Sequence, residues 1–269
     1  MKLSQLPIYI IDAFTDTLFK GNQAAVVPLQ SWLPESTMQS IASENNLSET
    51  AFFVRNDAGV YEIRWFSPLK EIDFCGHATL ASAYVIFNHL GEKGIITFWA
   101  KAVGNIEVNE CENGLIEMSF PNREPELVAD APEALKTGLS IVPLEFHKNQ
   151  QAYFVVYKDE DDVKNVVPNL EKLKMLAPFD VVVTAPSAEY DFVSRYFWPA
   201  NGGVEDPVTG SIHAGLAPFW AKRLDRKELV ALQASQRSGV LYCRVNEASV
   251  YVSGMCVAYL DGKITLPFQ

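Results

Sequence analysis

Short runs of β-branched and aromatic residues make up most of the chain, and glycine, asparagine or aspartate bounds most of these runs. This pattern is typical of strands rather than helices. In the first half it predicts strands at 8–12, 51–54, 60–66, 95–99, 104–108 and 114–120. In the second half it predicts strands at 152–157, 181–184, 192–197, 229–233, 240–245, 249–252 and 257–260, and Asp261-Gly262 has the composition of a hairpin turn.

Helical patterns are few, and they are expected at 35–44, 77–90, 171–176 and 211–223. The second and the fourth are apolar and rich in alanine, and each is embedded in predicted strands. Pro218 lies inside the fourth and is expected to kink or break it. The sequence therefore predicts an α+β fold in which each half wraps a curved sheet around its own long helix.

The two halves have related sequences. Sliding the chain by 131 positions places Arg64-Trp65-Phe66-Ser67-Pro68 on Arg195-Tyr196-Phe197-Trp198-Pro199, and Cys75 on Asp206. The halves are expected to span 1–122 and 123–269 and to meet at a stretch punctuated by two prolines. A duplicated fold with different reactive groups at equivalent turns predicts one site in a cleft, with each half supplying one wall.

Composition and charge narrow the function. Of 269 residues, 48% are hydrophobic and 20% are charged, which is normal for a globular protein. A net charge of −11 argues against nucleic acid or an anionic membrane as a partner. No signal peptide or membrane-spanning run is evident, so a soluble, cytoplasmic protein is expected. Four cysteines without CxxC spacing indicate neither a disulfide framework nor a zinc knuckle.

Five ordered motifs carry a resemblance that covers almost the whole chain: Asp12-Ala13-Phe14-Thr15, Gly21-Asn22-Gln23-Ala24-Ala25-Val26-Val27, Asn46-Leu47-Ser48-Glu49-Thr50-Ala51-Phe52, Asp73-Phe74-Cys75-Gly76-His77-Ala78-Thr79 and Asp206-Pro207-Val208-Thr209-Gly210-Ser211. The sequence resembles the PhzF family of phenazine-biosynthesis isomerases. The resemblance implies a diaminopimelate epimerase-like fold of two pseudo-symmetric halves with mainly antiparallel sheets. It also implies a homodimer and a cofactor-independent isomerase that acts on a small carboxylate-bearing substrate.

Glu49 is the expected general acid/base. It precedes an apolar strand, so burial is expected to raise its pKa toward the working range. An isolated glutamate more often caps a helix end or bonds a nearby turn. The family resemblance favours the catalytic role, because the matching glutamate moves a proton between substrate carbons.

Two helix starts are expected to bind the substrate. Gly76 and His77 begin one helix, where free N–H groups favour a carboxylate. Gly210 and Ser211 are their counterpart in the second half, with Thr209 as a plausible N-cap. The resemblance implies that residues matching His77, Asp206 and Ser211 line the site with the glutamate. The remaining residues expected to contact substrate are Asn22 and Cys75.

Three alternatives stay open from the sequence. An epimerase or racemase would use the Cys75 thiol with Asp206 or Glu49 as opposed bases, although the second half has no matching cysteine. A non-catalytic binding protein could retain the cleft without the chemistry. A metal site built from Cys75, His77, Asp73 and Asp206 is weaker still, because no metal-ligand spacing supports it. Neither a metal nor an organic cofactor is therefore expected.

Overall fold

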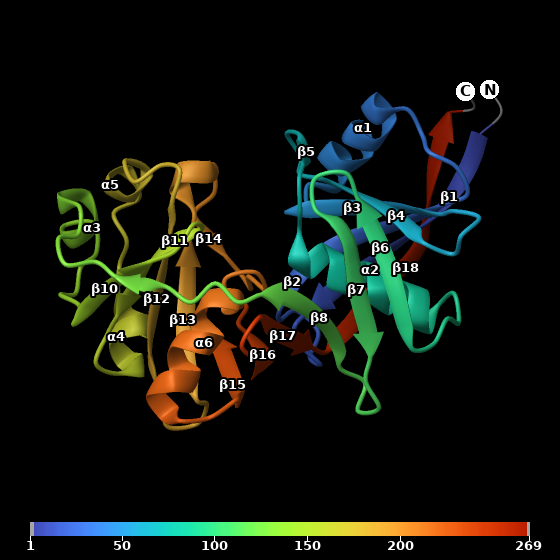
Figure 1. Cartoon of the computed structure of the whole chain (residues 1–269). Coiled ribbons are helices and arrows are strands. Elements are labelled where there is room, and N and C mark those ends of the chain that lie inside the picture. Colours follow the sequence, from blue (N-terminus) through green and yellow to red (C-terminus); the bar gives the residue numbers. More distant parts are fainter. Residues whose placement is uncertain (1–2, 268–269) are drawn as a thin grey trace. The chain divides into compact units, whose positions relative to one another are not determined.

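The computed structural model describes residues 3–267, which form two compact units (Figure 1). Unit 1 contains the chain up to Ser119 and again from Ser253 onward, and unit 2 is Phe120–Val252. The first crossing lies close to the predicted boundary at 122/123. The division differs from the predicted 123–269 half at the other end, because the last strand of the chain belongs to unit 1.

Unit 1 is a mixed sheet around one long helix. Its elements are β1 (Leu3–Ala13), β2 (Asn22–Leu29), α1 (Glu35–Asn45), β3 (Glu49–Arg55), β4 (Tyr61–Phe66), β5 (Glu71–Ile72), α2 (Gly76–Asn88), β6 (Ile95–Ala100), β7 (Gly104–Glu110), β8 (Ile116–Pro121) and β18 (Cys256–Pro267). The strands pair in the order β18, β1, β2, β3, β4, β6, β7, β8, and the short β5 also pairs with β4. The pairs β2/β3 and β4/β6 are parallel, and the others are antiparallel.

Unit 2 repeats this arrangement. Its elements are β9 (Glu126–Leu127), α3 (Glu133–Lys136), β10 (Glu145–Lys148), β11 (Ala152–Val156), α4 (Glu160–Asn165), α5 (Leu170–Lys174), β12 (Asp180–Pro186), β13 (Phe192–Phe197), the 3-10 turn η1 (Pro199–Asn201), β14 (Glu205–Asp206), α6 (His213–Leu224), β15 (Glu228–Gln233), β16 (Gly239–Val245) and β17 (Ser249–Gly254). The pairs β11/β12 and β13/β15 are parallel, as are β2/β3 and β4/β6. Matching strand directions confirm the α+β fold with two pseudo-symmetric halves.

The long helix of each unit is buried against its sheet (Figure 1). Helix α2 contacts β1, β2 and β3, and helix α6 contacts β15 and β16. Most residues of α2 are buried, from His77 to Phe87, as are the residues of α6 from His213 to Trp220. A helix that is buried around most of its circumference needs small side chains where strands approach it, which explains the alanine content of both segments.

Helix α6 continues through Pro218. A proline within a helix cannot donate a hydrogen bond to the carbonyl four residues earlier. That carbonyl, on Ala214, instead accepts a bond from the backbone N–H of Arg123 at 3.0 Å. The expected early break is therefore wrong, because a neighbouring segment of unit 2 satisfies the freed acceptor.

The predicted hairpin at Asp261-Gly262 is also wrong. Strand β18 runs through both residues, which pair with Tyr9 and Ile8 of β1. A two-residue hairpin of this composition needs positive φ angles, and neither residue has one. The long antiparallel pairing with β1 keeps this segment extended, and it is what returns the C-terminal strand to unit 1.

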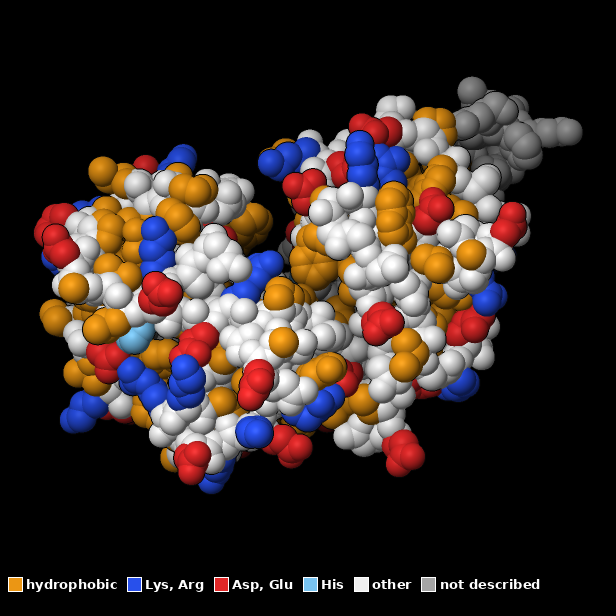
Figure 2. Space-filling view, in the orientation of Figure 1, with side chains coloured by type: hydrophobic (Ala, Val, Ile, Leu, Met, Phe, Trp, Pro, Cys, Tyr) orange, Lys and Arg blue, Asp and Glu red, His pale blue; other side chains and the backbone are white. Residues whose placement is uncertain are grey.

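Charged side chains of both signs are scattered over the face drawn in Figure 2, with hydrophobic side chains between them. Within residues 3–267, no helix has the length and hydrophobicity that crossing a bilayer requires. All four cysteines are free thiols.

Candidate active site

Glu49 begins strand β3 directly after helix α1. The helix ends at Asn45, its C-cap Asn46 adopts the left-handed conformation with φ 51°, and the chain then turns into the sheet. The side chain of Asn45 donates a hydrogen bond to the Thr50 hydroxyl, which fixes this turn. Glu49 lies beside Ala24 of the parallel strand β2 and is only 8% exposed. The predicted acid/base is thus a buried carboxylate at the start of a central strand.

Asn22 begins the neighbouring strand β2 and is fully buried. Gly21 sets its position, because Gly21 has φ +65° and a Cβ there would lie 2.2 Å from the carbonyl oxygen of Ala13. Only glycine fits this conformation and this close approach. Asn22 lies two residues before Ala24, and side chains two apart share one face of a sheet. Asn22 and Glu49 therefore point to the same face.

His77 connects these side chains. Its Nε2 lies 3.1 Å from Glu49 Oε2, an ion-pair distance, and its Nδ1 lies 3.1 Å from Asn22 Nδ2. The Cys75 sulfur lies 3.4 Å from His77 Nδ1. Cys75 is the N-cap of α2, yet its side chain forms no capping bond, and the first N–H groups of a helix have no helical acceptor. The structure thus brings together Glu49, His77, Cys75 and Asn22 beside the start of α2, which begins at Gly76.

Burial and neighbouring charges set the protonation of this cluster. Burial, and then the Glu49 carboxylate, raise the pKa of the Cys75 thiol to about 11. Burial alone would lower the pKa of His77, but the Cys75 sulfur and the Glu49 carboxylate outweigh it and raise that pKa well above its usual value. Because its pKa lies well above 7, the Cys75 thiol is protonated at neutral pH. Burial thus outweighs the thiolate stabilisation that a helix N-terminus usually provides.

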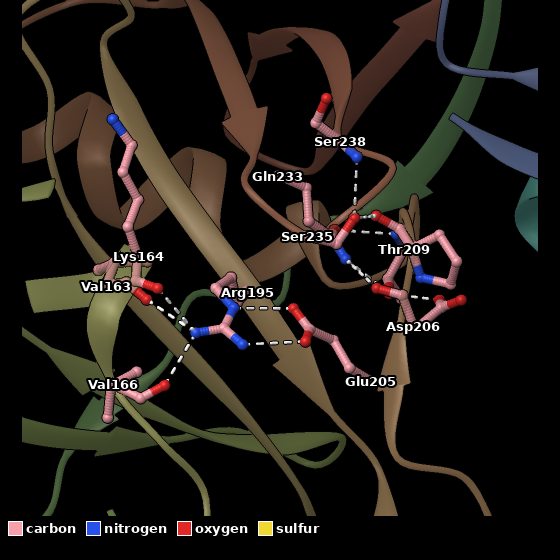
Figure 3. Close-up of polar contacts among 11 residues, drawn as sticks. Val163, Lys164, Val166, Arg195, Glu205, Asp206, Thr209, Gln233, Ser235 and Ser238 are labelled. Atoms are coloured by element: carbon pink, nitrogen blue, oxygen red, sulfur yellow. Dashed lines mark hydrogen bonds and ion pairs between the residues drawn. The ribbon is translucent and has the colours of Figure 1, made fainter. Parts of the chain in front are cut away.

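The second predicted cluster is the turn from Asp206 to Ser211, which precedes α6 in unit 2 (Figure 3). The Thr209 hydroxyl donates to the Asp206 carboxylate at 2.5 Å. Gln233, fully buried in β15, accepts a bond from the Thr209 N–H at 2.9 Å and donates to the Asp206 carbonyl at 2.8 Å. The Ser235 hydroxyl donates to the Pro207 carbonyl at 2.7 Å. The turn is therefore held from outside by the end of β15.

Thr209 is not the N-cap of α6. The helix begins at His213, its N-cap is Ile212, and Ile212 forms no side-chain capping bond. The Thr209 hydroxyl is directed to Asp206 instead. Gly210 and Ser211 lie in the turn that leads into the helix, rather than in its first turn as expected.

Strand pairing corrects the predicted equivalence of the two halves. Thr50 pairs with Phe66, and Val181 pairs with Phe197, so the offset of 131 holds for these strands. Glu71 then lies opposite Phe66, whereas Glu205 lies opposite Phe197. The connection in unit 2 is therefore three residues longer.

Beyond this insertion, Asp206 corresponds to Ile72 and not to Cys75. The equivalence of Cys75 with Asp206 is wrong, and Thr209-Gly210-Ser211 corresponds to Cys75-Gly76-His77. The hydrogen bonds after each turn support the same alignment of the two halves. The Thr79 hydroxyl donates to the Cys75 carbonyl at 2.6 Å, and His213 Nδ1 lies 2.9 Å from the Thr209 carbonyl oxygen at the same spacing.

The arginine that begins each repeated motif holds the strand before each turn. Arg64 forms paired bonds with Glu71, and Arg195 forms paired bonds with Glu205 at 2.8 and 2.9 Å. Arg195 also donates to the carbonyls of Val163, Lys164 and Val166, at the end of α4 (Figure 3). Both ion pairs join a central strand to the short strand that leads into the turn. The two turns are thus supported in the same way.

Comparison with known proteins identifies the family of the chain. The profile of the PhzC-PhzF family, described as "Phenazine biosynthesis-like protein", matches residues 11–262. The chain belongs to the PhzF family. It is 44% identical to an uncharacterized isomerase of Pseudomonas aeruginosa, over 97% of this chain and all of that protein. It is 32% identical to the human phenazine biosynthesis-like domain-containing protein, over 97% of this chain and 99% of that one.

Solved structures extend the comparison. A PhzF-family protein of Enterococcus faecalis superposes with a TM-score of 0.93 at 41% identity, covering 97% of this chain and 99% of that one. A hydroxyproline epimerase of Agrobacterium vitis shares the fold, with a TM-score of 0.63 at 9% identity and coverage of 97% and 93%. The relatives named as isomerases support isomerase chemistry for this PhzF-family protein at the level of the family.

Glu49, Cys75 and His77 also offer one potential metal ligand each, and the three ligand atoms lie within 4.8 Å of one another. Carboxylate, thiolate and imidazole are all zinc ligands. The sequence prediction of no metal considered Cys75 and His77 with Asp73 and Asp206, and it did not include Glu49. His77 contacts both other groups, so removal of metal ions with a chelator is an informative experiment on this cluster.

Two glutamines of the second cluster were not identified from the sequence. Gln233 holds the backbone of the turn, and Gln151 donates to the Ser211 hydroxyl at 3.0 Å. Gln233 ends β15 and Gln151 lies in the turn between β10 and β11, both distant in sequence from this cluster, and glutamine has no characteristic spacing that would mark it. The 131-residue offset gives one signal in the sequence that could have pointed to residues of the second cluster. It places Glu49 on Asp180, the first residue of β12.

Proposed function

We propose that this protein is a cofactor-independent isomerase that moves a proton within a small carboxylate-bearing substrate, amino acid-like or cyclic. Glu49 is the general acid/base. His77 assists it, and Asp206 positions the substrate or holds its amine. The residues proposed to contact the substrate are Asn22, Cys75 and Gly76 of the first half and Thr209, Gly210 and Ser211 of the second.

The observation that carries this proposal is the Glu49 carboxylate, which is 8% exposed and 3.1 Å from His77 Nε2. A buried carboxylate is available to take up a proton only when a substrate carbon supplies one, because water has little access to it. The adjacent His77, when protonated, would offset the negative charge that develops on the substrate.

The start of α2 supplies a second element of this chemistry. The N–H groups at Gly76 and His77 have no helical acceptor and lie at the positive end of the helix dipole. A substrate carboxylate bound there would withdraw electron density from the adjacent carbon as its proton leaves. This is electrostatic stabilisation of the kind that an oxyanion hole provides.

With a single acid/base, the same group removes the substrate proton and returns it. The proton that Glu49 removes is the proton that it returns, unless exchange with solvent occurs first. Because Glu49 is buried, exchange is expected to be incomplete, and part of the substrate hydrogen should reappear in the product. Two opposed bases would instead deliver a solvent proton at each turnover.

The epimerase alternative requires Cys75 as one of two bases. Its thiol is buried, with a pKa raised to about 11 by burial and by Glu49, and Thr209 stands at the corresponding position of the second half. A thiol of this pKa is a poor base at neutral pH. The binding-protein alternative gives no role to the Glu49 carboxylate, although the ion pair with His77 offsets part of the cost of burying it.

The test is a screen of cyclic and acyclic amino carboxylates in deuterium oxide, followed by proton NMR. The proposal expects loss of a carbon-bound proton signal, or its migration to another carbon, for at least one compound. Uniform absence of both in all compounds, with binding detected for some, would favour the binding protein. A biosynthetic role, a cytoplasmic location and a homodimer stay predictions from the sequence and the family resemblance.

A further inference from the structure

A continuous chain of hydrogen bonds in unit 2 ends at Ser211. The Tyr196 hydroxyl donates to Asp180 Oδ2 at 2.6 Å, and Gln151 Nε2 donates to the Tyr196 oxygen at 3.2 Å. The same Gln151 nitrogen donates to the Ser211 hydroxyl oxygen at 3.0 Å. Asn201 donates to the other Asp180 oxygen at 2.8 Å. Residues from four separate segments of the unit therefore form one chain of hydrogen bonds, and Gln151 connects that chain to Ser211.

The chemistry of the groups fixes the direction of each bond. An ionised Asp180 only accepts, so Tyr196 must donate its hydrogen to it. The Tyr196 oxygen is then an acceptor, which requires the NH₂ end of Gln151 to face it. The second hydrogen of that NH₂ group is directed to Ser211. Because the Ser211 oxygen accepts this bond, the Ser211 hydrogen remains available to donate elsewhere.

The positions of these residues match those of the first cluster. Strand pairing makes Asp180 the counterpart of Glu49, and it makes Ser211 the counterpart of His77. In unit 1 the carboxylate lies 3.1 Å from the imidazole directly. In unit 2, Tyr196 and Gln151 span the interval between the corresponding groups.

We propose that Asp180, Tyr196 and Gln151 are positioning residues that hold the Ser211 hydroxyl as a hydrogen-bond donor to an anionic group, a carboxylate, of the substrate. The inference rests on the proposed function, since it assigns the ligand of Ser211 as the substrate carboxylate. A serine that rotates freely would donate to a carboxylate or accept from an amide equally well. A serine whose oxygen already accepts one bond has only one lone pair left but keeps its hydrogen to donate, which favours a carboxylate, a group that only accepts.

The experiment compares two probes of the same shape, the anion benzoate and the neutral benzamide, titrated by calorimetry. Wild type is expected to bind benzoate more tightly than benzamide. Ser211→Ala, Tyr196→Phe and Gln151→Met are each expected to weaken benzoate binding about tenfold, the typical loss of a hydrogen bond to a charged group. A hydrogen bond to the neutral benzamide carbonyl is worth less than one to a charged group, so benzamide binding is expected to weaken less, by about threefold, in the same variants.

The matched control is Tyr157→Phe. It removes another tyrosine hydroxyl of unit 2, one that donates to the Ile141 carbonyl at 3.0 Å and takes no part in the chain. Benzoate affinity should not change in this variant. Circular dichroism melts identify any variant that fails to fold. If Tyr196→Phe fails to fold, Gln151→Met tests the same chain of hydrogen bonds in its place.

The double variant Ser211→Ala with Tyr196→Phe decides whether the tyrosine acts through the serine. Its benzoate affinity should equal that of Ser211→Ala alone. A further loss in the double variant, an equal loss for both probes in Tyr196→Phe, or no preference of wild type for benzoate would overturn the inference. If the binding results hold while no carboxylate exchanges its proton, the proposed isomerase function fails and the role of the serine stands.

Discussion

Acidification should destabilise the folded protein through His213. This residue is fully buried at the start of α6, and its ring stacks on Phe192 with 5.9 Å between centroids. Nδ1 lies 2.9 Å from the carbonyl oxygen of Thr209, which can only accept, so Nδ1 carries the hydrogen. Nε2 is buried and has no hydrogen-bond partner among residues 3–267. A proton added there would create a buried, unpaired charge.

The sign and size of the effect follow from the pKa. Burial lowers the pKa of His213 from 6.5 to about 4. Between these values the unfolded chain binds a proton that the folded protein does not, so the free energy of unfolding falls as the pH falls. The loss is about 2 kcal/mol at pH 5 and about 3 kcal/mol at pH 4, relative to pH 7.

The assay compares wild type with His213→Gln by urea unfolding at several pH values from 7 to 4. Glutamine can still donate to the Thr209 carbonyl, but it does not titrate. The variant should be the less stable protein at pH 7, where the packing of the ring is lost. The difference between the two should shrink by about 3 kcal/mol by pH 4, because only wild type loses the histidine contribution. Parallel stability curves, or an NMR titration of His213 with a midpoint near 6.5, would refute the reasoning.

Three further predictions concern the two clusters. Gly21→Ala should lower the melting temperature and disturb Asn22, because the new methyl would meet the Ala13 carbonyl at 2.2 Å and φ is +65°; an unchanged melt would contradict this. Gln233→Leu should destabilise unit 2 by about 1–3 kcal/mol, since the buried turn loses two bonds, and urea unfolding would measure the change. Dialysis against a chelator should leave proton exchange unchanged, and elemental analysis should find less than stoichiometric zinc; an activity that zinc restores would instead assign a metal to the first cluster.

Much of the fold could be predicted from residue patterns alone. The run from Phe192 to Phe197 forms strand β13 with the expected bounds, and the two alanine-rich segments form the central helices. The residues within each of these segments are enough to predict its secondary structure. Asp261-Gly262 fails because a local turn preference competes with a long pairing to β1 that is not visible in the local sequence.

The candidate site could be predicted only where a motif is contiguous. His77 and Glu49 do meet, but Asp206 was matched with Cys75 because a constant offset cannot detect an insertion between β13 and β14. The bonds that orient Ser211 were missed for another reason. Gln151 is 60 residues from Ser211, and nothing in the sequence pairs them.

The most direct test of the account is deuterium wash-in, compared between Glu49→Gln and Cys75→Ala with a substrate identified by the screen. Glutamine preserves the shape of the buried side chain and removes only its ability to carry a proton. Glu49→Gln should bind substrate but lose exchange by on the order of 10²- to 10⁴-fold, the usual contribution of a general acid/base.

Cys75→Ala should lose much less, because its thiol, with a pKa of about 11, is protonated at neutral pH. Exchange that survives in Glu49→Gln and disappears in Cys75→Ala would contradict the assignment of Glu49 and establish the thiol as the base.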